Sequence, residues 1–229
     1  MLFVEDSYLI NFDATILNID NNNIIIDKTA FYAKSGGQPG DVGKIILNEK
    51  EINIIDTIYD HKKNIIHVCE NTNDLQIGEK IKGKINWEIR YKHMRMHTAL
   101  HLLCSLIPYD VTGGQISFEK SRLDFNAEDK IEKEEIEIKI NQLVKDDYEI
   151  SYQWISHEDL DKQPDLVRTM SVKPPKTSDK IRLVKIGNID LQPCGGTHIK
   201  STKEIGKIII GKIENKGKMN RRVNLSIND

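Results

Sequence analysis

The sequence WEIRYKHMRMHTALHLLCSLI, residues 87–107, decides much of the architecture of this chain. Side chains recur at the three- and four-residue spacing of a helix face, at Met94, His97, Leu100, His101 and Cys104. The stretch therefore predicts one long helix, which ends before Pro108 because proline cannot continue it. Residues four apart lie one turn apart on the same face, so His97 and His101 present two imidazoles to one point.

A second pair with the same spacing lies in QPCGGTH, residues 192–198, where Cys194 precedes His198 by four positions. A thiolate and a third imidazole complete the tetrahedral nitrogen and sulfur set that zinc favours. Either pair alone is weak evidence, but the two together predict a Zn²⁺ site. Position 98 is threonine, so the glutamate base of the H-E-x-x-H metalloprotease motif is absent.

A third motif, TAFYAKSGGQPGDVG, spans residues 29–43. Its glycines lack the G-x-G-x-x-G register of a dinucleotide site, and no G-K-[ST] follows as in a phosphate-binding loop. The motif predicts a tight loop that joins two strands. Gln38 stands between Gly37 and Pro39, where a rigid loop can present its amide to a ligand.

Taken in order, the three motifs resemble the editing domain of alanyl-tRNA synthetases, in the stand-alone AlaX form that carries the glycine-rich motif. The resemblance implies hydrolysis of the ester in tRNA(Ala) wrongly charged with serine or glycine. It also implies that the glycine-rich loop lies over the editing pocket and that Gln38 acts there on the substrate. In 229 residues we expect no ATP-binding aminoacylation domain, and therefore no use of ATP.

The sequence predicts some roles within the site more firmly than others. We expect His97, His101 and Cys194 to be metal ligands, with His198 either the fourth ligand or the group that handles the attacking water. Discrimination of serine from alanine needs a hydrogen-bonding group for the serine hydroxyl, for which the candidates are Thr29, Gln38 and Thr197.

Three further side chains lie close in sequence to the predicted ligands, and two of them have two interpretations. Asp190 either hydrogen-bonds a ligand histidine or caps a turn, and the sequence does not separate the two. His93 and Cys104 continue the stripe of His97 and His101. His93 is either a group that orients a ligand or a packed histidine, and Cys104 is expected to be a small buried residue.

The net charge is −2, from 33 basic and 35 acidic residues, which argues against indiscriminate binding of nucleic acid. The charge is unevenly distributed, however: residues 199–222 carry eight basic and two acidic side chains, whereas residues 128–147 carry four and eight. Either one face is thus suited to phosphates, or both stretches are only solvated surfaces. We expect contacts with tRNA from this basic strip, at Lys216, Lys218, Arg221 and Arg222.

The sequence also indicates in which cellular compartment the protein is expected. It has no apolar run of membrane-spanning length and no basic secretory leader, so we expect no membrane association. Three cysteines do not make an even disulfide framework, which favours a reduced, cytoplasmic protein.

The predicted fold class is α+β in two domains. Short strands with turns fill residues 1–88, and we expect six of them, at 12–19, 22–28, 44–48, 51–60, 64–68 and 80–87. They predict a small β-barrel or sandwich, of which we favour the barrel. Residues 89–229 predict a zinc-binding α+β domain with helices on an antiparallel sheet. After the long helix we expect a strand at 115–125, a helix at 128–147, a strand at 148–155, a short helix at 156–162, an irregular connection with Pro164, Pro174 and Pro175, and strands at 181–191 and 205–214.

Two other functions fit the same residues. A non-catalytic RNA-binding module with a structural zinc predicts a closed four-ligand site and unchanged binding in Gln38→Ala. A metal-dependent hydrolase of small esters or amides predicts that the basic strip is dispensable.

Overall fold

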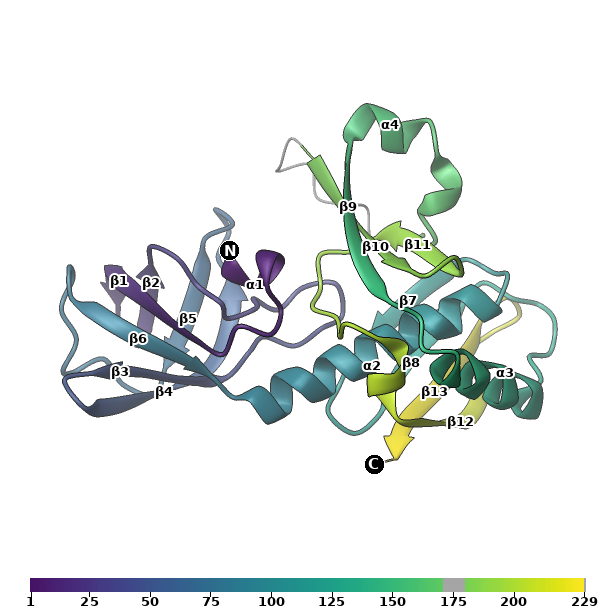
Figure 1. Cartoon of the computed structure of the whole chain (residues 1–229), viewed down its shortest axis with the longest axis horizontal. Coiled ribbons are helices and arrows are strands. Elements are labelled where there is room, and N and C mark those ends of the chain that lie inside the picture. The colour runs from purple at the N-terminus through teal and green to yellow at the C-terminus, as the bar shows by residue number, and fades with distance from the viewer. Residues whose placement is uncertain (171–179, 229) are drawn as a thin grey trace. The chain divides into compact units, whose positions relative to one another are not determined.

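A computed structural model describes residues 1–170 and 180–228 of the chain, shown in Figure 1. The chain divides into two compact units, Met1–His93 and Met94–Asp229. The division falls inside helix α2, Trp87–Leu106, which confirms the long helix predicted from the sequence. The domain boundary between residues 88 and 89 stays a prediction.

The first unit is a closed barrel of six strands in the order β1-β2-β5-β4-β3-β6, preceded by the short helix α1, Leu2–Glu5. Every neighbouring pair in the barrel is antiparallel. All six strands predicted in this region are present: β1 Asn11–Asp20, β2 Asn23–Ile26, β3 Gly43–Leu47, β4 Lys50–Tyr59, β5 Ile65–Cys69 and β6 Lys80–Ile85.

Alternation of side chains explains why these strands close on themselves. In β6, Ile81, Gly83 and Ile85 are buried while the three lysines that alternate with them are exposed. Successive side chains of a strand point to opposite faces, so one face of each strand supplies the barrel core. Isoleucines dominate this core, among them the fully buried Ile16, Ile24, Ile45 and Ile54.

The second unit contains two antiparallel sheets, which confirms the predicted α+β class. The larger has the order β12-β13-β8-β7, and the smaller has the order β11-β10-β9. Helix α3, Lys133–Lys145, contacts β12 and buries Ile136, Ile140 and Val144. The strands are β7 Val111–Gln115, β8 Ser121–Phe125, β9 Ile150–Ser156, β10 Lys180–Ile186, β11 Asp190–Pro193, β12 Lys207–Asn215 and β13 Arg221–Asn228.

The structure corrects three expectations about elements. The strand expected at 115–125 is a hairpin, β7 and β8, whose turn is held by the Ser117 hydroxyl and the backbone of Lys120. The strand expected at 181–191 is interrupted by Gly187, whose φ of 49° turns the chain from β10 to β11. Strand β13 was not expected, although its buried Val223, Leu225 and Ile227 alternate as a strand requires.

The remaining connections follow the sequence. Helix α4, His157–Asp161, is the expected short helix, and the Ser156 hydroxyl accepts a hydrogen bond from the Asp159 amide at its start. Pro164 opens the short 3-10 helix η1, Pro164–Leu166, while Pro174 and Pro175 lie outside the described residues. Another 3-10 helix, η2, covers Thr202–Ile205.

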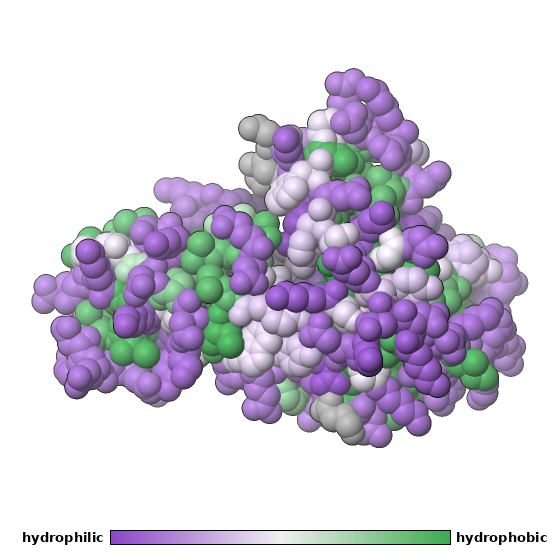
Figure 2. All heavy atoms as spheres, in the orientation of Figure 1, coloured by the Kyte–Doolittle hydropathy of each residue, from purple (hydrophilic) through white to green (hydrophobic). Residues whose placement is uncertain are grey.

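Hydrophilic residues predominate on the face drawn in Figure 2, and hydrophobic residues emerge among them over the barrel strands. In the part of the chain that the structure describes, every helix is too short or too polar to cross a membrane.

Candidate metal centre

Helix α2 supplies the first two side chains of the centre. His97 and His101 lie one turn apart, and they are 7% and 6% exposed. All residues from Met96 to Cys104 are buried, so this part of α2 is packed on every side. The surroundings therefore fix the two imidazoles instead of leaving them free to rotate in solvent.

The loop after β11 supplies the other two side chains, Cys194 and His198. Arg182 of β10 holds this loop: its Nε donates to the Cys194 carbonyl at 3.0 Å and its Nη2 to the Gly196 carbonyl. The Cys194 amide donates back to the Arg182 carbonyl at 3.1 Å. Two ligand candidates four residues apart thus come from a loop tied to the sheet, not from a helix.

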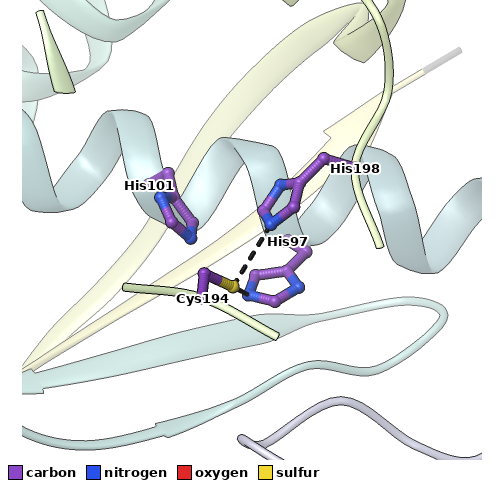
Figure 3. A group of neighbouring side chains, drawn as sticks. All are labelled: His97, His101, Cys194 and His198. Carbon is purple, nitrogen blue, oxygen red and sulfur yellow. Dashed lines mark hydrogen bonds between the residues drawn. The ribbon is translucent and has the colours of Figure 1, made fainter. Parts of the chain in front are cut away.

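The four side chains converge, as Figure 3 shows. Their ligand atoms all lie within 4.8 Å of one another. The Cys194 sulfur lies 3.5 Å from His97 Nε2 and 3.3 Å from His198 Nε2. In a tetrahedral zinc site with ordinary bond lengths, sulfur and nitrogen ligand atoms lie about 3.5 Å apart. The residues present therefore fit a zinc-sized ion held by one thiolate and three imidazoles.

Hydrogen bonds behind the cluster orient two of the imidazoles. His101 Nδ1 lies 2.8 Å from Asp190 Oδ2, and a carboxylate only accepts, so Nδ1 carries the proton. The amide of Gln192 donates to the same carboxylate at 2.9 Å. The Nε2 lone pair of His101 is thereby left for the cluster. A carboxylate or amide behind a histidine ligand is a common arrangement in zinc sites.

His198 is fixed in a similar way by Thr98. The Thr98 hydroxyl donates its one proton to the Met94 carbonyl at 3.0 Å. Its oxygen therefore accepts from His198 Nδ1, which lies 3.1 Å away. This tautomer places the Nε2 lone pair of His198 on the side of the Cys194 sulfur.

Electrostatics within the cluster favour the protonation states that a metal needs. Burial alone raises the pKa of the Cys194 thiol, but the nearby His97 and His198 outweigh burial and hold that pKa well below its usual value. Burial and His97 likewise hold the pKa of His198 well below its usual value. A thiolate and a neutral imidazole are the forms that bind a metal ion.

His101 behaves differently. Burial lowers its pKa, but the hydrogen bonds to Asp190 and Cys194 outweigh burial and raise the pKa to about 10. Without an ion, a proton on His101 balances the negative charge of the carboxylate and the sulfur. A metal cation supplies the same balance, so ion and proton compete for this position.

The other predicted substrate residues are buried. Gln38 is 1% exposed, and its backbone amide donates to the Ser35 carbonyl across the tight glycine-rich turn at 2.9 Å. The Thr29 hydroxyl lies 2.9 Å from His67 Nε2 and accepts from the Phe31 amide, so it already has partners in the barrel unit. Thr197 is fully buried within the loop that carries Cys194 and His198.

The sequence did not reveal what anchors the glycine-rich loop. Asp41, at its end, forms a fully buried ion pair with Arg90 of α2, with Nε 2.9 Å from Oδ1. Arg90 also donates to the carbonyls of Ser7 and Ala30. Gly40 is required here because a Cβ would collide with the Thr57 carbonyl. A buried pair of charged residues 49 positions apart leaves no local signal in the sequence.

The four predicted RNA-binding residues cluster around the turn from β12 to β13, but much of their charge is already paired. Lys216 pairs with Glu214 at 2.9 Å, and Arg222 with Asp124 at 2.7 Å. Arg221 donates to backbone carbonyls of the turn, including that of Gly217 at 3.1 Å. Lys218 is exposed. Their role in binding RNA stays a prediction.

The sequence also singled out three side chains near the predicted ligands: His93, Cys104 and Asp190. His93 is buried and is outside the four-residue cluster found among the described residues. Cys104 is 3% exposed, as expected for a packed residue, and burial raises the pKa of its thiol to about 11. Asp190 contacts His101, one of the predicted ligands, as the first of its two interpretations requires. Thr98, Gln192 and Arg182 were missed; Gln192 alone left a signal, since it alternates with Asp190 along one strand.

Known families match both parts of the chain. A family model described as the threonyl and alanyl tRNA synthetase second additional domain matches residues 181–224, which include the loop with Cys194 and His198. A model described as tRNA synthetases class II (A) matches residues 6–89, which include the barrel.

Individual relatives extend over nearly the whole chain. It is 37% identical to the alanyl-tRNA editing protein AlaX-M of Saccharolobus solfataricus, over 97% of this chain and 96% of that protein. The alanyl-tRNA editing protein AlaX-L of Pyrococcus horikoshii is 35% identical over 95% of this chain and 55% of its own length. The alanine–tRNA ligase of Pyrococcus abyssi is 32% identical over 93% of this chain but 24% of the ligase. The chain therefore belongs to the AlaX family of alanyl-tRNA editing proteins, which is related to the editing domain of alanyl-tRNA synthetase.

Proposed function

We propose that this chain is a trans-editing hydrolase that cleaves the ester of tRNA(Ala) mischarged with serine, with glycine as a second substrate, in a zinc-dependent reaction. The observation that carries the proposal is the convergence of His97, His101, Cys194 and His198 within 4.8 Å. The relatives named as alanyl-tRNA editing proteins supply the substrate class. The three free thiols fit the reducing cytoplasm, where tRNA is charged.

Zinc is the proposed ion because one thiolate and three imidazoles form a ligand set that it prefers over the oxygen-seeking Mg²⁺ and Ca²⁺. When bound, zinc would supply Lewis-acid chemistry, which lowers the pKa of a water or polarises a carbonyl; with four protein ligands, this chemistry needs one of them to give way. The ester is already labile, so the chain's own residues need to do little more than position it.

His198 is proposed as a ligand and not as the group that moves a proton. A general base works best with a pKa near the operating pH, whereas the pKa of His198 lies well below its usual value. The Nδ1 contact with Thr98 leaves only Nε2 for chemistry, and Nε2 lies 3.3 Å from the Cys194 sulfur. His198→Ala and His101→Ala are therefore both expected to weaken metal binding.

Thr197 is the proposed reader of the serine hydroxyl. It lies within the loop that carries two of the four proposed ligands, and it is fully buried, so a hydrogen bond from its hydroxyl to the substrate would be shielded from water. Gln38 is proposed as a second substrate contact because the family resemblance assigns it that role. Thr29 is a third candidate, and its hydroxyl contacts His67 and the Phe31 amide.

The basic strip is proposed to contact tRNA phosphates. Lys218 and Arg221 have no carboxylate partner among the contacts described above, whereas Lys216 and Arg222 are in ion pairs. Replacing Lys218 and Arg221 together with glutamine is expected to lower the slope of log Kd against log salt by up to about two, because up to two fewer counterions are released. The control is Lys133→Gln with Lys145→Gln on α3; an equal slope in both proteins would contradict the proposal.

One assay tests the function and its selectivity. The zinc-loaded protein is incubated with Ser-tRNA(Ala), Gly-tRNA(Ala), Ala-tRNA(Ala) and free serine esters, and release of amino acid is followed. We expect fast cleavage of the seryl and glycyl esters and slow cleavage of the alanyl ester. Thr197→Val is expected to keep zinc and to reduce the serine-to-alanine rate ratio by about tenfold or more.

Other outcomes identify the rival functions. A rate with Ser-tRNA(Ala) that equals the rate in buffer favours an RNA-binding module with a structural zinc. Cleavage of free esters as fast as of the tRNA esters favours a small-ester hydrolase. Equal rates for serine and alanine leave the hydrolase standing and refute its specificity.

A further inference from the structure

One face of the small sheet β11-β10-β9 connects the metal centre with two exposed aromatic side chains. The register pairs Trp154 of β9 with Arg182 of β10, and the backbone bond between Arg182 and Cys194 continues that row to the centre. The next row runs from Tyr152 through Val184 to Gln192, which contacts the Asp190 carboxylate behind His101. Directly opposite residues share a face of a sheet, so both rows lead from the centre to an aromatic ring.

These rings are exposed in a way that the fold itself does not require. Trp154 is 50% exposed and Tyr152 is 36% exposed. The opposite face of the same sheet is buried, where Ile181 and Leu183 pack with Leu160 of α4. On the side of the aromatic pair, Arg182 and Val184 of β10 are buried, and the two exposed rings lie on β9, the last strand of the sheet. Strands are spaced about 4.8 Å apart, so the backbone of Trp154 lies about 10 Å from that of Cys194.

Charge near the rings matches an anionic partner. The guanidinium of Arg182 lies 4.8 Å from the centre of the Tyr152 ring. Its Nη1 is buried and has no hydrogen-bond partner among the described residues. Lys180 is exposed and, two residues from Arg182 on the same strand, belongs to the same face.

We propose that Trp154 and Tyr152 form a stacking platform for the unpaired nucleotides at the 3′ end of the tRNA. The inference rests on the proposed function, because the ester to be cleaved is attached to the last of these nucleotides. Aromatic side chains beside positive charge are the usual means of holding single-stranded RNA without reading its sequence. A platform about two strands from the metal ligands places the adjoining bases while the ester reaches the centre.

The direct test is fluorescence, because the chain has only two tryptophans. Trp87→Phe keeps an aromatic ring against Tyr91 in the barrel unit and leaves Trp154 as the single emitter. Uncharged tRNA, and a short single-stranded RNA with the sequence of a tRNA 3′ end, are titrated into this protein. We expect saturable quenching by both. Emission that responds to neither RNA overturns the platform, and this readout needs no hydrolysis.

Substitutions of Trp154 distinguish the loss of base stacking from damage to the structure. Trp154→Ala is expected to raise the Kd for tRNA by roughly tenfold or more, and Trp154→Phe by much less. Both are expected to retain zinc and the rate with free serine esters. Phe118→Ala removes another exposed ring of the same unit, 39% exposed, and is expected to leave binding unchanged.

The other occupant to consider is a second copy of the chain, because β9 is the last strand of its sheet. Sedimentation of the wild-type protein as a dimer, and of Trp154→Ala as a monomer with unchanged tRNA affinity, would overturn the proposal. Loss of hydrolysis in every variant, with quenching intact, would refute the proposed function and leave the platform standing.

Discussion

Asp190 shows how a single residue outside the four-residue cluster can prepare a candidate metal site. Its carboxylate contacts His101 Nδ1 and the Gln192 amide, which fixes the side of the imidazole that faces the cluster. It also supplies negative charge that helps to raise the pKa of His101 to about 10, against the effect of burial. The same charge favours a cation, so we expect Asp190 to contribute to metal affinity without touching the ion.

Asp190→Asn tests this role. The amide can still accept from His101 but carries no charge, so zinc affinity should fall by roughly 10- to 100-fold. The measurement is competition with a chromogenic chelator at fixed pH. Asp159→Asn, an exposed acid of α4 in the same unit, is the control and should leave affinity unchanged. Equal affinity in all three proteins would show that Asp190 serves only to pack the turn.

The spacing of residues in the sequence predicted the four-residue cluster but not the contacts that support it. The two i, i+4 pairs were sufficient to predict that four side chains, from segments almost one hundred positions apart, would lie together. The contact of Asp190 could not be chosen beforehand, because an acid before a turn caps it as readily as it binds a histidine. Arg182 left no pattern at all, since its partners are backbone carbonyls of a loop.

At the scale of elements, the glycine-rich loop depends on a helix for its shape. Asp41 at the loop's end and Arg90 on α2 are both fully buried, and the Tyr32 amide also donates to Asp41 at 2.5 Å. A buried carboxylate is tolerated only while its charge is matched. The loop that contains Gln38 is therefore fixed by an ion pair and not by its glycines alone.

Arg90→Met is expected to destabilise the protein by about 3–5 kcal/mol, because it leaves the Asp41 charge buried without its partner. Urea unfolding of the metal-loaded protein, followed by far-UV circular dichroism, measures the change. The double variant Arg90→Met with Asp41→Asn removes both charges and should recover part of the loss. A single variant as stable as the wild type would contradict this account of the loop.

Element prediction succeeded where periodicity was regular and failed at turns. The barrel strands alternate cleanly, so all six were predicted, and α2 was predicted almost to its last residue. The β7–β8 hairpin was missed because its turn is made by Ser117 and Lys120, without a strong turn motif. Strand β13 was missed because it begins with two adjacent charged residues, Arg221 and Arg222. Its alternating apolar residues are only the three that follow, Val223, Leu225 and Ile227.

For the molecule as a whole, the centre ties together parts of the chain that are distant in sequence. His97 and His101 belong to α2, whereas Cys194 and His198 follow β11. An ion bound here adds a link between these elements in the folded state only, so zinc should raise the thermal midpoint of the second unit. The fold class followed from the sequence, but the division into two small sheets depends on long-range pairing that no local pattern encodes.

The most direct test of the account is reconstitution of the metal-free protein. Zinc is removed by chelation, added back in measured equivalents, and cleavage of Ser-tRNA(Ala) is followed at each step. We expect negligible activity without zinc, a linear rise, and a plateau at about one equivalent per chain, with no recovery in Cys194→Ala. Full activity in chelated protein that elemental analysis shows to contain no transition metal would contradict the central claim.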